Sequence, residues 1–328
     1  MPSLLNVDVG SRIAVDRREP MCCPACGQTG AKSWLLAPDR FHGRSERYEL
    51  VRCPVCSLVW LKDPPAPQDM GYHYGSDYDR IIAVAGENSP DRWRARRKTL
   101  DRYKSGGALL DLGCSSGSFL ETMKGDKWTL SGIEISPDVA RMAEVRSGAQ
   151  VFVGDILSAP FPPESFDVVT CFHVYEHLYD PIKIMQKVRT WLRPGGIFYF
   201  LVPNIESGAA RVFGTYWYGL ELPRHLFHFS PSSLRGIAKA THLKELSITT
   251  HREPFIEYST RYVCDSLLQR MGISRKSLAE AKAPSFPAKA IRKLYRETLL
   301  RLFSGMLVLA GEGESIHAVL MRPEWDGE

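Results

Sequence analysis

The stretch LLDLGCSSGSFLE, residues 109–121, decides the fold. An apolar run that contains Asp111 ends at Gly113, and three small residues then lead to Gly117 and a further apolar pair. This order predicts a strand that passes through a glycine-rich turn into a helix. Glycine allows the chain to turn tightly and a ligand to approach the backbone closely. In a parallel sheet, such a turn at the carboxyl end of a strand is a place for a nucleotide.

Strands and helices alternate along the chain around this turn, which favours a parallel α/β sheet covered on both faces. Apolar runs predict strands at 107–112, 129–135, 150–153, 166–172, 196–203, 244–250 and 315–321. Helices are expected at 91–104, 116–125, 136–148, 181–196 and 230–242. Pro194 and the glycine pair after it are expected to end the helix at 181–196 and turn the chain into the next strand.

The chain has 328 residues and a net charge of +5, which leaves room for one large domain and a smaller one. Basic residues concentrate at 91–104 and are interpreted as a solvated helix face, so no nucleic-acid partner is expected. The first 20 residues lack the apolar core of a secretory signal. The apolar run 299–310 has 12 residues, too few to span a bilayer. We therefore expect a cytoplasmic protein without a transmembrane segment.

Four cysteines form two Cys-x-x-Cys pairs, Cys23 with Cys26 and Cys53 with Cys56, separated by 26 residues. Two such pairs can place four thiolates around zinc, each at about 2.3 Å. The alternatives are a redox pair or a coincidence without metal, and Cys22 could compete as a ligand. Because all four positions would be filled by protein, we expect a structural zinc rather than a catalytic one.

Two acidic residues follow the second and third predicted strands. Glu134 comes 23 residues after Asp111 and can accept both ribose hydroxyls of an adenosine, and Asp155 can accept from an adenine amino group. Taken singly, Glu134 could be a surface carboxylate and Asp155 could cap the next turn. Glu176 and His177 could cap a helix start in the same way. A third glycine is absent from the turn, which argues against a dinucleotide fingerprint and an NAD enzyme.

As an ordered set, these features resemble the class I methyltransferases that depend on S-adenosylmethionine (SAM). The glycine loop, Glu134, Asp155, the EHL turn at 176–178 and LRPGG at 192–196 occur in that family's order over 107–251. The resemblance implies a seven-stranded Rossmann-like sheet, with the glycine turn at the methionine end of SAM, Glu134 at the ribose and Asp155 with Ile156 at the adenine. The residues that it places at the cofactor are Asp111, Gly113, Cys114, Ser115, Gly117, Glu134, Ile135, Asp155, Ile156, Phe172, His173 and His177.

Methyl transfer from a sulfonium is an in-line displacement, so the acceptor atom must be held near the methyl group, at about 3 Å. A hydroxyl acceptor also needs a base. The aromatic segment 214–234 offers His225 as that base and His228 as a second candidate, although either could be a structural histidine. The tyrosine segment 72–78 could lie over the acceptor as a lid, with Tyr74 and Tyr78 at the chemistry, or it could simply pack.

The zinc-binding pairs, YHYGSDY at 72–78 and PRHLFHFSPSSL at 223–234 resemble zinc-containing methyltransferases of sugar and glycan biosynthesis. The resemblance implies His225 as the base and a nucleotide-linked or lipid-linked sugar as the acceptor. Arg224 stands where the sugar C-methyltransferases have a carboxylate, which favours a hydroxyl and leaves the methylated atom open. The alternatives are an O-methyltransferase of a quinone, phenol or other small metabolite, and a zinc-containing RNA- or protein-interaction module.

The expected organisation follows from these segments. The helical insertion is expected to contain helices near 255–272 and 286–310, and it could be a dimer surface, an acceptor lid, a lipid-facing patch or buried core. The expected parts are a disordered N-terminus (1–20), a zinc-binding subdomain (21–69), a tyrosine-rich lid and linker helix (70–106), the SAM-binding core (107–251), the helical insertion (252–314) and the last core strand with its tail (315–328).

Overall fold

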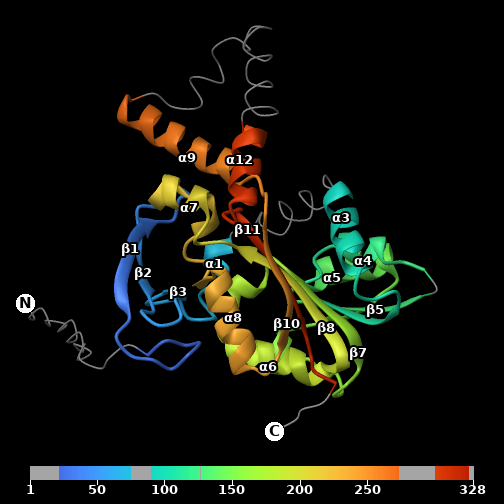
Figure 1. Cartoon of the computed structure of the whole chain (residues 1–328). Helices are drawn as coiled ribbons and strands as arrows, with labels where there is room; N and C mark the ends of the chain where they lie inside the picture. Colours follow the sequence, from blue (N-terminus) through green and yellow to red (C-terminus); the bar gives the residue numbers. More distant parts are fainter. Residues whose placement is uncertain (1–21, 75–89, 126, 273–299, 325–328) are drawn as a thin grey trace, which may run out of the picture.

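The computed structural model describes residues 22–74, 90–125, 127–272 and 300–324, which form two sheets with helices around them (Figure 1). The expected disordered N-terminus (1–20) and Tyr78 lie outside the described residues, as does most of the helix expected at 286–310. Within the described residues, no helix is long and apolar enough to cross a membrane.

The larger sheet has seven strands in the order β10-β11-β8-β7-β4-β5-β6. Strands β4 to β8 run parallel, and β11 is antiparallel to both of its neighbours. The strands are β4 (Gly107–Leu112), β5 (Trp128–Glu134), β6 (Gln150–Val153), β7 (Phe166–Phe172), β8 (Leu192–Pro203), β10 (Lys244–His251) and β11 (Ser315–Met321). This mostly parallel Rossmann-like sheet confirms the fold expected from the sequence.

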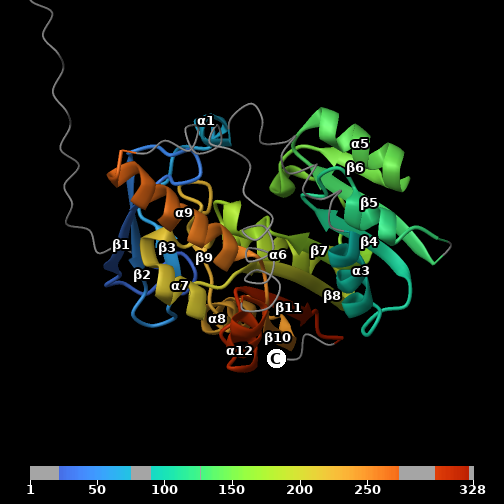
Figure 2. The same cartoon turned by 90° about the horizontal axis from the view of Figure 1, so that it is seen from above.

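Alternate residues of each strand point to opposite faces of this sheet, because side chains in a strand repeat every two residues. Leu109 and Val168 pack toward one face, whereas Leu110 and Val169 pack toward the other. The first face is covered by α3 (Pro90–Leu100), α4 (Ser118–Thr122) and α5 (Pro137–Ser147), and the second by α6 (Pro181–Trp191) and α8 (Pro231–Ala240) (Figure 2). Both faces are therefore buried, as the unbroken apolar runs of the inner strands require.

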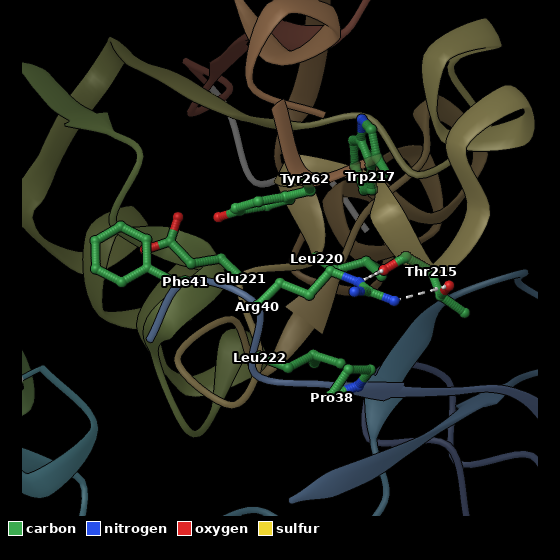
Figure 3. A pocket seen from close by; sticks show the side chains of 9 residues that line it. All are labelled: Pro38, Arg40, Phe41, Thr215, Trp217, Leu220, Glu221, Leu222 and Tyr262. Carbon is green, nitrogen blue, oxygen red and sulfur yellow. Dashed lines mark hydrogen bonds between the residues drawn. The ribbon is translucent and has the colours of Figure 1, made fainter. Parts of the chain in front are cut away.

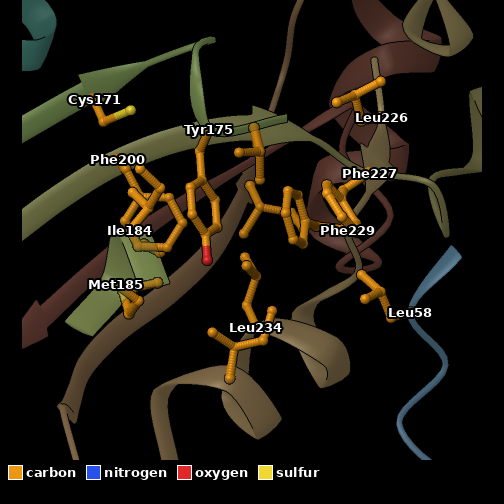
Figure 4. Close-up of a cluster of buried hydrophobic side chains, with 14 of the residues drawn as sticks. Leu58, Cys171, Tyr175, Ile184, Met185, Phe200, Leu226, Phe227, Phe229 and Leu234 are labelled. Carbon is orange, nitrogen blue, oxygen red and sulfur yellow. The ribbon is translucent and has the colours of Figure 1, made fainter. Parts of the chain in front are cut away.

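Aromatic rings fill the core on the second face (Figure 4). The Tyr175 ring stacks on Phe229 with centroids 4.9 Å apart and meets Phe200 of β8 edge-on at 5.5 Å. The Tyr175 hydroxyl donates to the carbonyl of Pro181 at 2.7 Å. Because large buried rings contribute much of a core's stability, these contacts fix the turn that follows β7 against the region after β8.

The second sheet joins the four-cysteine segment to the core. Its order is β1 (Lys32–Pro38), β2 (Arg47–Arg52), β3 (Val59–Leu61) and β9 (Phe227–His228), all antiparallel. Strand β9 comes from the segment after β8, and its two residues pair with Trp60 and Val59. The sequence did not predict β9, because two residues carry no periodic pattern. The pairing holds the segment around His225 against the four-cysteine segment.

The remaining elements are short, apart from α9. They are α1 (Gly71–Tyr74), α7 (Gly208–Phe213), α9 (Phe255–Arg270), α12 (Leu300–Leu309) and the 3-10 turns η1 (Ile156–Ser158), η2 (Tyr175–His177), η3 (Gly214–Tyr216) and η4 (Tyr218–Leu220). Helix α9 agrees with the helix expected at 255–272, and α12 is the described part of the helix expected at 286–310.

Helices α4 and α6 are much shorter than the sequence predicted, and α3 ends at Leu100 rather than at residue 104. Helix α6 ends at Trp191, because the residue before Pro194 is disfavoured in a helix and the chain is already extended at Leu192. LRPGG therefore belongs to β8 rather than to the end of the helix. Helix α4 begins only at Ser118, because Gly117 has the left-handed φ of +76°.

Candidate active site

The glycine turn at the end of β4 can be built only with glycine at two places. Gly113 and Gly117 have φ angles of +65° and +76°. A Cβ atom on Gly113 would overlap the side chain of Val174, and one on Gly117 would lie 2.8 Å from the Cα of Ala143. Ser115 between them also has a positive φ of +47°, which a serine tolerates poorly. The turn therefore lies tightly against α5 and the segment after β7.

The Glu134 carboxylate is held at the end of β5 by three backbone N–H groups. Ser115 donates to Oε2 at 3.0 Å, and Ile135 and Ser136 donate to Oε1 at 2.8 and 3.0 Å. A carboxylate has about four acceptor positions, so these three bonds fix the orientation of the Glu134 side chain. Asp155, at the end of β6, accepts from the N–H of Leu157 at 2.8 Å and caps η1.

Asp111 is buried under the turn. Its Oδ1 accepts from the Thr170 hydroxyl at 2.6 Å, and burial raises the pKa of Asp111 to about 7. Beside the turn, Cys114 is also buried. Ile135 follows β5 and is exposed, and Ile156 follows β6 and is buried. Phe172 is the last residue of β7 and packs edge-on against Phe119. All of these positions lie at the carboxyl ends of four adjacent parallel strands.

A buried arginine from α3 lies close to this edge. Arg96 lies over the rings of Trp93 and Phe172, at 4.4 and 4.7 Å. Its Nε and Nη2 make no hydrogen bond within the described residues, and Glu253 Oε1 lies 4.0 Å from Nη2. Burial lowers the pKa of Arg96 to about 10. The expectation of a wholly solvated face at 91–104 is therefore wrong here, because Arg96 shares the buried face of α3 with Leu100.

His173 connects this region to a second buried carboxylate. The Nδ1 of His173 is 3.5 Å from Glu176, and its Nε2 is 3.8 Å from Glu253. Burial opposes a charge on His173, but its hydrogen bonds to Glu176 and Glu253 outweigh burial and raise its pKa. Burial likewise opposes the charge of Glu253, yet the hydrogen bond to His173 lowers its pKa to about 2. The sequence analysis missed Glu253, which was counted with the helical insertion.

Two histidines expected from different parts of the sequence meet beside Glu176. The rings of His177 and His225 lie edge-to-face with centroids 4.6 Å apart. Nδ1 of His225 is 2.9 Å from the carbonyl of Gly219, which can only accept, so Nδ1 carries a proton and the lone pair of the neutral imidazole is on Nε2. A Cβ atom on Gly219 would overlap the ring of Trp217, so only glycine fits at this position.

The free nitrogen of His225 faces two carboxylates. Nε2 is 3.5 Å from Glu221 Oε2 and 4.0 Å from Glu176 Oε1. Burial opposes the negative charge of Glu176, but its hydrogen bond to His173 outweighs burial and lowers its pKa. Burial also opposes the charge of Glu221, whose pKa is lowered mainly by the positive charge of His225. Both carboxylates are therefore ionised near neutral pH and can stabilise a protonated His225. Three side chains of this cluster are also close enough to hold a metal ion. One possible ligand atom from each lies within 4.8 Å of the other two, and the residues are Glu176, His177 and His225.

The other candidate groups surround this cluster. The hydroxyl of Tyr74 is 3.2 Å from Nδ1 of His177, and burial raises the pKa of Tyr74. Burial and His225 lower the pKa of His177 to about 4 and that of His228 to about 3, so both rings are neutral at pH 7. His228 donates to the carbonyl of Leu220 at 3.0 Å and holds η4. Tyr72 is 69% exposed, so Tyr74 is the tyrosine of the described part of the 72–78 segment that lies at the cluster.

The four cysteines meet as expected. Cys23 and Cys56 have sulfurs 3.5 Å apart, and those of Cys26 and Cys53 are 3.6 Å apart. One Sγ atom from each lies within 4.8 Å of all the others, and Cys22 is not in this group. A tetrahedral zinc with bonds of about 2.3 Å requires sulfurs about 3.8 Å apart. The arrangement therefore fits a zinc ion.

Comparison with known proteins identifies the family. The model of a family described as a methyltransferase domain matches residues 86–248. The chain is 32% identical over 162 residues to the ubiquinone biosynthesis O-methyltransferase of Paraburkholderia phymatum, covering 45% of this chain and 70% of the relative. This chain belongs to the class I SAM-dependent methyltransferases. The methyltransferase is also 32% identical over 164 residues to the enzyme of the same name from Burkholderia multivorans, covering 45% and 71% of the two chains.

A solved structure shows the same fold. The phosphoethanolamine N-methyltransferase 2 of Haemonchus contortus, in complex with SAM, superimposes with a TM-score of 0.51 at 17% identity. The match covers 81% of this methyltransferase and 62% of that chain. The expectations of an enzyme and of SAM as its cofactor are confirmed. The family match begins at residue 86, after the four cysteines.

Proposed function

We propose that this methyltransferase transfers the methyl group of SAM to a hydroxyl of a small ring-shaped acceptor, with His225 as the general base. The observation that carries the proposal is the fixed orientation of His225. Its Nδ1 donates to Gly219, and its Nε2 faces the carboxylates of Glu221 and Glu176. A general base needs a lone pair and a neighbouring charge that stabilises its protonated form, and His225 has both.

The reaction then moves one proton and one methyl group. As the acceptor oxygen attacks the methyl carbon in line, its proton passes to Nε2 of His225, and the carbon–sulfur bond breaks. Bound SAM would supply the methyl group from its sulfonium and leave as the neutral thioether S-adenosylhomocysteine. Glu221 and Glu176 stabilise the imidazolium until the proton leaves to solvent. Tyr74, which stays protonated, orients His177 beside the base.

The cofactor lies in this proposal across the carboxyl ends of β4 to β7. The turn from Gly113 to Gly117, with Asp111 below it, holds the methionine end, Glu134 binds the ribose, and Asp155 with Ile156 binds the adenine. The fixed Glu134 carboxylate and the close-packed glycines support this placement. Arg96 adds a buried cation whose N–H groups suit the methionine carboxylate.

The acceptor is a phenol or quinol rather than the sugar that the sequence favoured. The matched relatives carry the name ubiquinone biosynthesis O-methyltransferase, which supports an aromatic hydroxyl. A sugar hydroxyl is the second candidate, supported by the resemblance of the four-cysteine and 223–234 segments to glycan methyltransferases.

A structural zinc on Cys23, Cys26, Cys53 and Cys56 completes the proposal. The sulfur separations of 3.5 and 3.6 Å support it. With four protein ligands the ion has no open position for chemistry. Instead it fixes the loops beside β3, the strand that pairs with β9 and so supports the segment of His225.

One pair of measurements tests the function. The full chain is first titrated calorimetrically with S-adenosylhomocysteine, and release of this product from SAM is then measured with catechols and with nucleotide sugars. His225→Ala should abolish transfer and leave S-adenosylhomocysteine affinity unchanged. His242→Ala, an exposed histidine, is the matched control and should keep full activity. Normal turnover by His225→Ala would exclude it as the base, and transfer to sugars alone would exclude the phenol.

A further inference from the structure

The cluster beside the proposed base has the composition of a metal site. One possible ligand atom each from Glu176, His177 and His225 lies within 4.8 Å of the other two. Two imidazoles and a carboxylate form a ligand set that suits zinc and related transition metals, whereas magnesium and calcium prefer sites built from oxygen. The ligands come from η2 and from the segment before β9, so the fold joins two distant parts of the chain here.

Both histidines are oriented as metal ligands usually are. A histidine that binds a metal through one ring nitrogen generally donates its other N–H to a backbone carbonyl or a carboxylate. Nδ1 of His225 donates to the carbonyl of Gly219 at 2.9 Å, and Nδ1 of His177 donates to the carbonyl of Arg224 at 3.1 Å. The lone pair of each neutral ring is therefore on Nε2, the nitrogen that would bind the ion.

The carboxylate of Glu176 is buried with long contacts only. Its side chain is 1% exposed. Nδ1 of His173 and Nε2 of His225 lie 3.5 and 4.0 Å from its Oε1, and no donor in the described part of the chain comes closer to either oxygen. A buried carboxylate is costly unless it is closely paired or binds a metal. A cation between Glu176 and the two histidine rings would supply the missing partner.

The spacing of the ligand atoms suits an ion after a small movement. A tetrahedral zinc with bonds of about 2.1 Å needs ligand atoms about 3.4 Å apart. Nε2 of His225 is 4.0 Å from Oε1 of Glu176. The two atoms therefore need to approach each other by only about 0.6 Å. Three protein ligands leave the fourth position of the ion open for water.

A second carboxylate adds negative charge beside the cluster. Oε2 of Glu221 lies 3.5 Å from Nε2 of His225, and its Oε1 accepts from Nε of Arg224 at 3.1 Å. Figure 3 shows Glu221 at a narrow hollow between the loop after β1 and residues 215–222. The hollow has room for about one water molecule, so it admits an ion but no ring. His177, which is partly exposed, gives the cluster a second opening.

We propose that Glu176, His177 and His225 bind a divalent ion of the zinc class, and that bound ion and methyl transfer exclude each other. The ion uses the lone pair of Nε2 with which His225 takes the proton of the acceptor. The exclusion rests on the proposed function, because it uses His225 as the base, whereas the ion site itself does not. This site shares no ligand with the four cysteines, so it is separate from the structural zinc.

The zinc content of the full chain tests the site without reference to activity. After equilibrium dialysis against micromolar zinc, the wild type should hold about one zinc more per chain than His225→Ala or Glu176→Gln, whatever the cysteines hold. Glu176→Gln keeps the size of the buried side chain, and an unchanged affinity for S-adenosylhomocysteine shows that each variant is folded. His242→Ala, which changes an exposed histidine, should hold as much zinc as the wild type. Excess magnesium should not displace the ion.

Methyl transfer then tests the exclusion, with free zinc held constant by a metal buffer. Turnover of the catechol or nucleotide sugar that proves to be methylated should fall about a hundredfold or more as the site fills, because that is the usual contribution of a general base. Removal of the ion with a chelator should restore it. The residual turnover of Glu176→Gln should not respond to zinc, which separates this site from general poisoning of the enzyme. Turnover that is unchanged or raised while the site fills would overturn the exclusion.

The two measurements distinguish the two levels of inference. If the wild type holds no more zinc than His225→Ala and Glu176→Gln, the ion site is wrong, and an inactive His225→Ala still supports the base. If the wild type holds the additional zinc but His225→Ala methylates normally, the ion site is supported and the base is wrong.

Discussion

Glu221 and His225 are joined twice. The backbone N–H of His225 donates to the carbonyl of Glu221 at 3.1 Å, and the Glu221 carboxylate lies 3.5 Å from the imidazole Nε2. The base and its carboxylate therefore belong to one turn of the chain and keep their relative positions. Glu221 acts through His225, which makes it a positioning residue for the proposed reaction.

Glu221→Gln should lower kcat on the order of tenfold to a hundredfold, because the amide no longer stabilises a protonated His225. S-adenosylhomocysteine affinity should not change, since Glu221 is not among the cofactor residues. Single-turnover methyl transfer measures the effect, with Glu245→Gln, an exposed glutamate of β10, as the control. An unchanged kcat with a raised KM would instead assign Glu221 to acceptor binding alone.

Arg224→Met should lower the free energy of unfolding by about 3–5 kcal/mol, since it takes the arginine partner away from the buried Glu221 carboxylate. Arg224 also donates to the carbonyl of His73 at 2.9 Å, so the loss should loosen α1. Urea denaturation measures the change. The exposed pair Arg235–Glu245 is the comparison, and Arg235→Met should cost at most about 1 kcal/mol. Equal costs at the two sites would contradict the argument.

Arg96→Met should weaken S-adenosylhomocysteine binding by about tenfold or more, because a charge-assisted hydrogen bond contributes about 1.5–3 kcal/mol. Arg94→Met removes an arginine of the same helix whose side chain is 67% exposed and should leave affinity unchanged. Calorimetric titration compares the two. If both variants bind like the wild type, the methionine carboxylate is held elsewhere.

Stability should fall with rising pH because of Asp111. Burial raises its pKa to about 7, against about 3.9 in an unfolded chain. Between these values the unfolded state has released the proton that the folded state keeps, so raising the pH across this range destabilises the fold. Asp111→Asn, which can still accept from Thr170, should therefore gain unfolding free energy relative to wild type from about pH 4 to pH 7.

Urea denaturation at the two pH values, without cofactor, measures this gain. Glu253 supplies a contrast of opposite sign. Its pKa is lowered to about 2, so its stabilisation is present near neutral pH and is lost as pH falls below about 4.5. Glu253→Gln should remove the loss of stability below about pH 4.5. It should leave unchanged the fall in stability that Asp111 causes between about pH 4 and pH 7. If the stability difference between wild type and Asp111→Asn is constant with pH, the Asp111 effect is refuted.

Cys53→Ser should lose the zinc and destabilise the four-stranded sheet. Metal analysis of the purified chain should give about one zinc per molecule for wild type and much less for the variant. Cys22→Ser is the matched control, since Cys22 lies outside the cluster, and it should retain the metal. A Cys53→Ser protein with full stability would show that the cysteines do not support the fold.

The sheet could be predicted from the sequence because its signals are local. Each core strand is an apolar run, and Gly113 and Gly117 mark the turn through their own backbone conformations. The same holds for the two cysteine pairs, whose spacing alone suggests a cluster.

The electrostatic partners could not be predicted, because they come from distant elements. Arg96 of α3 approaches Glu253 of the segment before α9, and nothing near either residue signals the other. Glu221 lies only four residues before His225. An acidic residue at this spacing from a candidate base was the one signal in the sequence that could have predicted their contact. Its burial, however, depends on Arg224 and on packing against the four-cysteine segment.

The pairing of Val59 with His228 also affects how the chain is synthesised. Until the ribosome has released residue 228, strand β3 has no partner on one side, so its N–H and C=O groups are open to another chain. Contacts between segments so far apart in sequence form slowly. Nascent chains should therefore be prone to aggregate through β3. Cys23, Cys26, Cys53 and Cys56 all leave the ribosome before β3, so zinc bound to them early would shorten the time during which the edge of β3 is exposed.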